Sequence, residues 1–116
     1  MADAITSSPA WAALARHADT TADLHLRDLF AADPGRGDRL VVEVGDLYID
    51  YAKHRVTDET LARLGALATE RGLEERFAAM FAGEVVNTTE GRSVLHTALR
   101  RRRDDVLVVD GVDVVA

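Results

Sequence analysis

The sequence predicts a mainly helical α+β chain with about five short helices and two β-hairpins. Two observations lead to this prediction. Apolar residues recur at helical spacing over several stretches, and they alternate at every second residue in two others, around pairs that contain glycine. We expect helices at about residues 9–18, 21–32, 57–71, 73–82 and 88–101, and hairpins at residues 39–51 and 106–115.

The first two helices have clear start and stop signals. Ser8-Pro9 predicts a helix start, because serine is a favoured N-cap and proline fits the first helical turn. The apolar residues that follow recur at helical spacing, so this helix should pack one face. Asp33-Pro34-Gly35 should end the second helix. The residues expected to be buried in the two helices are Trp11, Leu14, Ala15, Ala18, Leu26, Leu29 and Phe30.

The two hairpins are predicted from their turns. Gly45-Asp46 and Asp110-Gly111 each separate two apolar runs, as a two-residue β-turn requires. Between the hairpins, Thr57 should cap a helix that ends at Gly72, and the next helix should follow directly. Their expected buried residues are Leu61, Leu64, Ala68, Phe77, Met80 and Phe81.

The stretch from Met80 to Arg100 predicts a helix with two different faces. Gly83 should end the preceding helix, and Asn87 and Glu90 have the spacing of a capping box. At helical spacing, one face would carry Val94, Leu95, Ala98 and Leu99, and another would carry Arg92, His96 and Arg100. Such a ridge of nitrogen-bearing side chains faces either an anion or water. The four arginines at 100–103 should complement the negative end of this helix and solvate a loop.

The same stretch resembles a known family. The run Met-Phe-Ala-Gly-Glu-x-x-Asn-x-Thr-Glu-Gly-Arg-x-Val-Leu-His-x-Ala-Leu-Arg is similar to the segment of glucose-6-phosphate isomerases that precedes their first sugar-isomerase (SIS) domain. The chain departs from the family at Ala52, where serine is usual, at Ser93 and Thr97, where apolar residues are usual, and in its four consecutive arginines. Further matches, in the same order as in the family, are 11–14, 26–30, 50–55 and 109–114.

The resemblance implies a function for a longer protein. The family interconverts glucose 6-phosphate and fructose 6-phosphate in glycolysis and gluconeogenesis, without metal or cofactor. A His–Lys pair opens the sugar ring, a glutamate moves the proton, an arginine stabilises negative charge, and a Ser/Thr-rich loop holds the phosphate. In the family these groups lie in the SIS domains or the C-terminal tail. Residues 1–116 therefore correspond to one N-terminal segment without SIS domains, expected to be inactive alone.

The resemblance also suggests two residues near the substrate. In the family this helix lies close to the active site, so Arg92 and His96 are candidates to support it from behind the groups that touch the sugar phosphate. The alternative is a plain polar face. The remainder of the isomerase, or a second subunit, is the partner that the resemblance implies.

Composition excludes several other functions. The net charge of −6 argues against nucleic-acid and anionic-membrane partners, and the chain has no cysteine for disulfides or thiolate metal sites. It lacks a signal peptide and any apolar run of membrane-spanning length, so a cytoplasmic location is expected. Its histidines show no metal-ligand spacing. They are His17, His25, His54 and His96.

A second hypothesis comes from a different class of protein. The chain could be a free-standing helical interaction module, one that binds a full-length isomerase subunit. The reading frame after residue 116 discriminates between the two, because a Ser-Gly-Gly-type phosphate loop there would indicate a truncated enzyme. If the chain is a segment of the enzyme, its apolar stripes should lack partners, and the isolated chain should self-associate or pack loosely.

Overall fold

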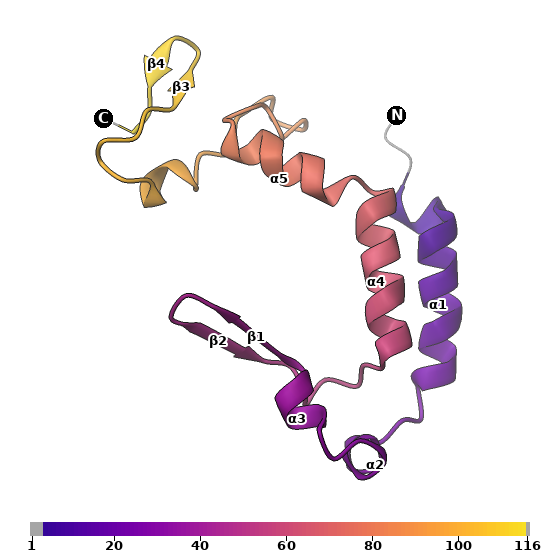
Figure 1. Cartoon of the computed structure of the whole chain (residues 1–116). Coiled ribbons are helices and arrows are strands. Elements are labelled where there is room, and N and C mark those ends of the chain that lie inside the picture. Colours follow the sequence, from indigo (N-terminus) through magenta and orange to yellow (C-terminus); the bar gives the residue numbers. More distant parts are fainter. Residues whose placement is uncertain (1–3, 116) are drawn as a thin grey trace. The chain divides into compact units, whose positions relative to one another are not determined.

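The computed structural model describes residues 4–115, which form mainly helices and two small antiparallel sheets (Figure 1). The predicted fold class is therefore confirmed. Within this part of the chain there are five α-helices and two β-hairpins. The chain divides into two units, residues 1–67 and residues 68–116, and each is described by itself.

The first unit begins with the 3₁₀ turn η1 (Ile5–Ser7) and helix α1 (Pro9–Thr21). The Ser8 hydroxyl accepts a hydrogen bond from the Trp11 amide at 3.2 Å, so the predicted N-cap is confirmed. Helix α2 (Leu26–Ala32) starts later than expected. The reason is that the Thr20 and Thr21 hydroxyls donate back to the His17 carbonyl, which makes them the last turn of α1.

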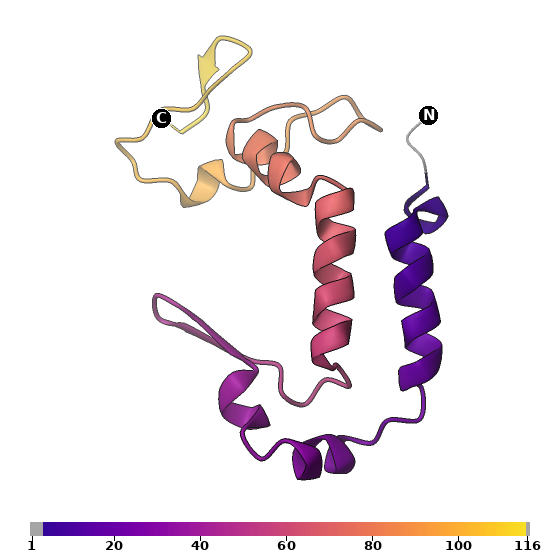
Figure 2. The same cartoon turned by 45° about the vertical axis from the view of Figure 1, so that its right-hand side comes forward.

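A short helix that the sequence did not predict connects α2 to the first hairpin. Asp33-Pro34-Gly35 ends α2 as expected, and α3 (Arg36–Arg39) follows at once. Strands β1 (Val41–Val44) and β2 (Leu47–Asp50) then pair in antiparallel register around Gly45-Asp46, where Gly45 has a φ of 57°. The predicted hairpin is confirmed, and it projects from α3 as an arm (Figures 1 and 2).

Helix α4 (Asp58–Glu70) runs beside α1 (Figures 1 and 2). Thr57 caps it as predicted: its hydroxyl accepts from the Thr60 amide at 3.2 Å, and the Thr60 hydroxyl accepts from the Thr57 amide at 3.0 Å. The ring Nε2 of His17, a buried residue of α1, lies 2.7 Å from the Thr60 hydroxyl. This bond joins the two helices at the start of α4.

The second unit is built on helix α5 (Leu73–Phe81), which lies between two glycines with positive φ. Gly83, predicted to end this helix, has a φ of 78° and faces the last hairpin so closely that an added Cβ would lie 2.7 Å from Cγ2 of Val109. That hairpin consists of β3 (Val108–Val109) and β4 (Val112–Asp113). Its turn residues, Asp110 and Gly111, both have positive φ, as a type I′ turn requires.

The predicted helix at 88–101 is wrong. Asn87 and Glu90 do interact: the Asn87 side chain accepts from the Glu90 amide at 3.2 Å and donates to its carboxylate at 3.3 Å. However, Asn87 and Arg92 exchange both backbone hydrogen bonds, and Gly91 takes a φ of 64°. These bonds close a tight turn instead of starting a helix. Only the 3₁₀ turn η2 (Ala98–Arg100) forms later in the stretch.

Neither unit has a large core. The buried apolar residues are Leu40 and Ala52 in the first unit and Ala98 and Leu107 in the second. Among the described residues no large side chain is completely buried, and Leu99, expected on a buried face, is 86% exposed. Side chains from most elements therefore present apolar surface to solvent. The exposed ones in the predicted helical stripes are Ala15, Ala18, Leu64, Phe77, Phe81 and Leu99.

Candidate functional site

The structure does not align the two predicted site residues on one helix face. Arg92 closes the Asn87 turn through its backbone, and His96 begins the turn that leads into η2. Both side chains are exposed. The third member of the predicted ridge, Arg100, donates to the His96 carbonyl at 3.2 Å. Arg92 and His96 thus lie on an irregular, solvent-facing segment, with three residues between them in the chain.

The arginine run after this segment interacts with helix α5. The guanidinium of Arg101 donates to the carbonyl of Phe81, the last residue of α5. A cation at this end favours the helix, because the carbonyls there carry partial negative charge. Arg102 forms an exposed pair with Asp104 at 3.2 Å. The predicted role in complementing a helix end thus holds for Arg101, but the helix is α5.

Arg36, which sequence analysis did not single out, forms three side-chain hydrogen bonds to backbone carbonyls of the first unit. Its side chain is buried and donates to the carbonyls of Ala52 at 2.9 Å, His54 at 2.8 Å and Val56 at 2.9 Å. It also lies 5.7 Å from the centre of the Phe30 ring. Arg36 therefore fixes the backbone between β2 and α4, while Lys53, His54 and Arg55 remain exposed.

Two exposed ion-pair groups border α4. The hydrogen bond from Arg63 lowers the pKa of Glu59, and the Glu59 carboxylate also lies 3.7 Å from His17. The pKa of Arg39 is raised mainly by its hydrogen bond to Asp33 and, to a smaller extent, by its hydrogen bond to Asp58.

Across residues 4–115, no three His, Cys, Asp or Glu side chains are grouped so that they could hold a metal ion.

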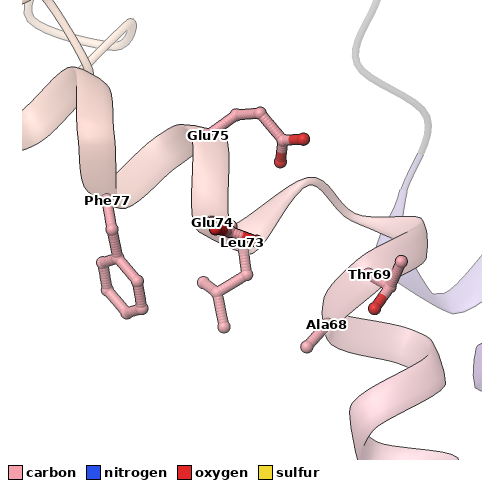
Figure 3. A pocket seen from close by; sticks show the side chains of 6 residues that line it. All are labelled: Ala68, Thr69, Leu73, Glu74, Glu75 and Phe77. Carbon is pink, nitrogen blue, oxygen red and sulfur yellow. The ribbon is translucent and has the colours of Figure 1, made fainter.

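A hollow of about 300 Å³ lies where α4 ends and α5 begins (Figure 3). Leu73 and Phe77 project on the same side of α5, while the Glu75 carboxylate points away from them. The lining contains no cationic side chain, so the hollow is unsuited to a phosphate group. Its residues are Ala68, Thr69, Leu73, Glu74, Glu75 and Phe77.

Comparison with known proteins identifies the family. The family model for phosphoglucose isomerase matches residues 50–116, more than half of the chain. The chain belongs to the phosphoglucose isomerase family. This confirms the resemblance found in the sequence, and the matched region contains α4, α5 and the whole second unit.

Three relatives of the family illustrate how much is shared. The glucose-6-phosphate isomerase of Deinococcus deserti is 62% identical over 115 residues, which are 99% of this chain and 21% of that protein. The enzyme of Mycobacterium tuberculosis H37Rv is 64% identical over 111 residues, and that of Mycolicibacterium smegmatis 62% over 112. The chain spans about a fifth of the length of the curated relatives it matches.

Several of the polar side chains described above are engaged with other groups of the chain. His17 is engaged with Thr60, Arg36 with backbone carbonyls and Glu59 with Arg63.

Within residues 4–115, no helix has both the length and the apolar character needed to cross a bilayer.

Proposed function

We propose that the chain is a segment of a cytoplasmic glucose-6-phosphate isomerase, which interconverts glucose 6-phosphate and fructose 6-phosphate in glycolysis and gluconeogenesis. The observation that carries this proposal is the 62–64% identity to such isomerases over 96–99% of the chain. The same identity gives no support to the free-standing module, since the related segments all belong to much longer enzymes.

The resemblance to the family implies that the catalytic groups belong to the rest of the enzyme. Proton transfer between neighbouring sugar carbons needs a carboxylate or imidazole within hydrogen-bond reach of the substrate, together with a cation for the developing negative charge. The resemblance implies that the groups with these roles lie in the SIS domains or the C-terminal tail of the family. The isolated chain should therefore bind sugar phosphate weakly at most and should not catalyse.

Within the enzyme, Arg92 and His96 are proposed to support the sugar-phosphate site. Both side chains are exposed in this chain and belong to the sequence motif that resembles the family. A cationic guanidinium beside a phosphorylated substrate lowers the free energy of the bound anion even without direct contact, because Coulomb attraction is weakly screened in a closed site. The segment also supplies apolar surface to the remainder of the isomerase, as its small buried core suggests.

A chimera tests the proposed function. Residues 1–116 replace the matching segment of the D. deserti isomerase, and turnover is followed in a coupled assay. We expect a rate within about tenfold of the parent enzyme, because substitutions outside the groups that transfer protons have modest effects. A chimera that folds normally by circular dichroism but shows no turnover would contradict the proposal, and so would turnover by the purified 116-residue chain.

A further inference from the structure

The hairpin β1–β2 has one face made only of aliphatic side chains. In antiparallel pairing, partners across the strands and residues two apart along a strand lie on the same face. The register pairs Val42 with Ile49 and Val44 with Leu47, so these four residues share one face. Val41, Glu43, Tyr48 and Asp50 share the other face.

This aliphatic face is uncovered within the first unit. The four side chains are 43% to 63% exposed, and the hairpin forms a sheet of only two strands. An isolated two-stranded hairpin is marginally stable in water, and contiguous apolar surface of this kind is typical of contact sites. The observed hairpin therefore lacks the layer against which a sheet normally packs.

The base of the hairpin is held firmly while its aliphatic face is open. Leu40, just before β1, is 2% exposed, and its carbonyl accepts from the Tyr51 amide at 3.0 Å. Ala52 is 1% exposed, and its carbonyl accepts from Arg36. An arm fixed at its base loses little conformational entropy when it docks, so the hairpin is preorganised for a contact.

We propose that this face docks on an apolar surface of the isomerase polypeptide outside residues 1–116. The inference rests on the proposed function. The alignment with the D. deserti enzyme covers 115 residues of this chain, so it includes the hairpin, and most of that enzyme lies outside the aligned segment. An apolar partner surface would match this face, because its four side chains are all aliphatic and the charged Glu43 and Asp50 lie on the opposite face of the hairpin.

A second copy of this chain is another possible occupant. Covalent connection favours the remainder of the isomerase, because a surface on the same polypeptide is present at high effective concentration, whereas a second copy must be recruited from solution.

Thiol labelling tests the docking, because the chain contains no cysteine. Leu47→Cys places a thiol on the aliphatic face, and Glu43→Cys provides a matched control on the opposite face of the same hairpin. Labelling rates are measured in the 116-residue chain and in the chimera with D. deserti isomerase, with the chimera lacking either substitution as background. In the 116-residue chain we expect similar rates at both positions.

In the chimera we expect Leu47→Cys to react about 100-fold more slowly than Glu43→Cys, since a docked thiol reacts only after local opening. Val44→Cys serves in place of Leu47→Cys if the latter chimera does not fold. Equal rates in a chimera that turns over substrate would overturn the docking but leave the proposed function intact. Loss of turnover in the unsubstituted, folded chimera would instead contradict the proposed function. Concentration-dependent protection in the 116-residue chain, with a dimer mass, would assign the face to a second copy and overturn the proposal.

Discussion

The guanidinium of Arg36 donates a hydrogen bond to the carbonyl of Val56 at 2.9 Å, twenty residues along the chain. This bond and the two to Ala52 and His54 join the end of the hairpin to the start of α4 through one buried side chain. Arginine suits this position because its planar group carries five donors and stays charged.

Replacing Arg36 should therefore destabilise the first unit. In Arg36→Lys the ammonium cannot reach all three carbonyls, and each one left without a donor costs about 1–3 kcal/mol. We expect a clear fall in the melting temperature of the chimera, measured by circular dichroism. Arg27→Lys is the matched control, because the Arg27 side chain is 85% exposed and should tolerate the change. Equal melting temperatures for the two variants would contradict the role of Arg36.

Glycine substitutions should separate close packing from backbone strain. Gly83→Ala should destabilise the protein by at least about 1–3 kcal/mol, because the new Cβ would meet Val109 at 2.7 Å in a residue with positive φ. Gly91→Ala should cost less, about 1–2 kcal/mol, since its φ is positive but its surroundings are open. Gly65→Ala, in a helix with open surroundings, should stabilise by about 0.5–1 kcal/mol. Denaturant melts of the chimeras measure all three, and a different order would contradict the described packing.

The Glu59–Arg63 pair should give a small pH-dependent stabilisation. Because Arg63 lowers the pKa of folded Glu59, the charged carboxylate favours the folded state. This contribution is complete above the ordinary glutamate pKa and disappears as the pH falls through the lower folded value. Glu59→Gln should reduce the melting temperature slightly at about pH 7, and this difference should shrink steadily as the pH is lowered into the acid range. Glu84→Gln, an exposed change outside the helices, controls for charge, and a difference that persists in acid would refute the linkage.

Arg92 should influence turnover more than stability. If it supports the sugar-phosphate site, Arg92→Ala in the chimera should lower kcat about tenfold, less than the loss of roughly 10²–10⁴ expected for a group that transfers protons. Arg103→Ala, another exposed arginine of the same unit, should leave kcat unchanged. If kcat and the melting temperature are both unchanged in Arg92→Ala, Arg92 does not support the sugar-phosphate site and is an ordinary surface residue.

The isolated chain should expose apolar surface in solution. Large side chains such as Phe77 and Phe81 are more than half exposed, so each forgoes part of the roughly 1.5–3 kcal/mol that complete burial contributes. We expect self-association by light scattering and binding of a hydrophobic dye, both reduced when the remainder of the isomerase is added as a separate chain. A monodisperse, cooperatively melting monomer that ignores the remainder would contradict this expectation.

The elements that sequence analysis predicted correctly are those with local signals. Ser8 and Thr57 cap helices, and Asp110-Gly111 forms a type I′ turn, because each of these preferences acts within a few residues. The signal at Asn87 and Glu90 was read correctly as an interaction but wrongly as a helix start. The same side-chain bonds fit a closed turn, and Gly91 makes that turn accessible.

The candidate site was less predictable than the fold. The contacts of Arg36 depend on how the chain folds back, and one arginine after Pro34-Gly35 carries no sequence signal for them. Helical spacing brought Arg92 and His96 together on a predicted face, so losing the helix removed that alignment. Their place in the family motif, by contrast, does not depend on the secondary structure around them.

The open aliphatic face of the hairpin has a consequence for the order in which an isomerase of this kind would assemble. The hairpin and the Arg36 contacts span short stretches of chain, so they can form early and quickly. A surface that would cover the face lies in a different part of the polypeptide and would arrive later. During that interval a two-stranded sheet with unpaired edges can pair with another unfinished molecule. Misassembly and chaperone binding would then compete with correct folding after the hairpin has formed and before its aliphatic face is covered.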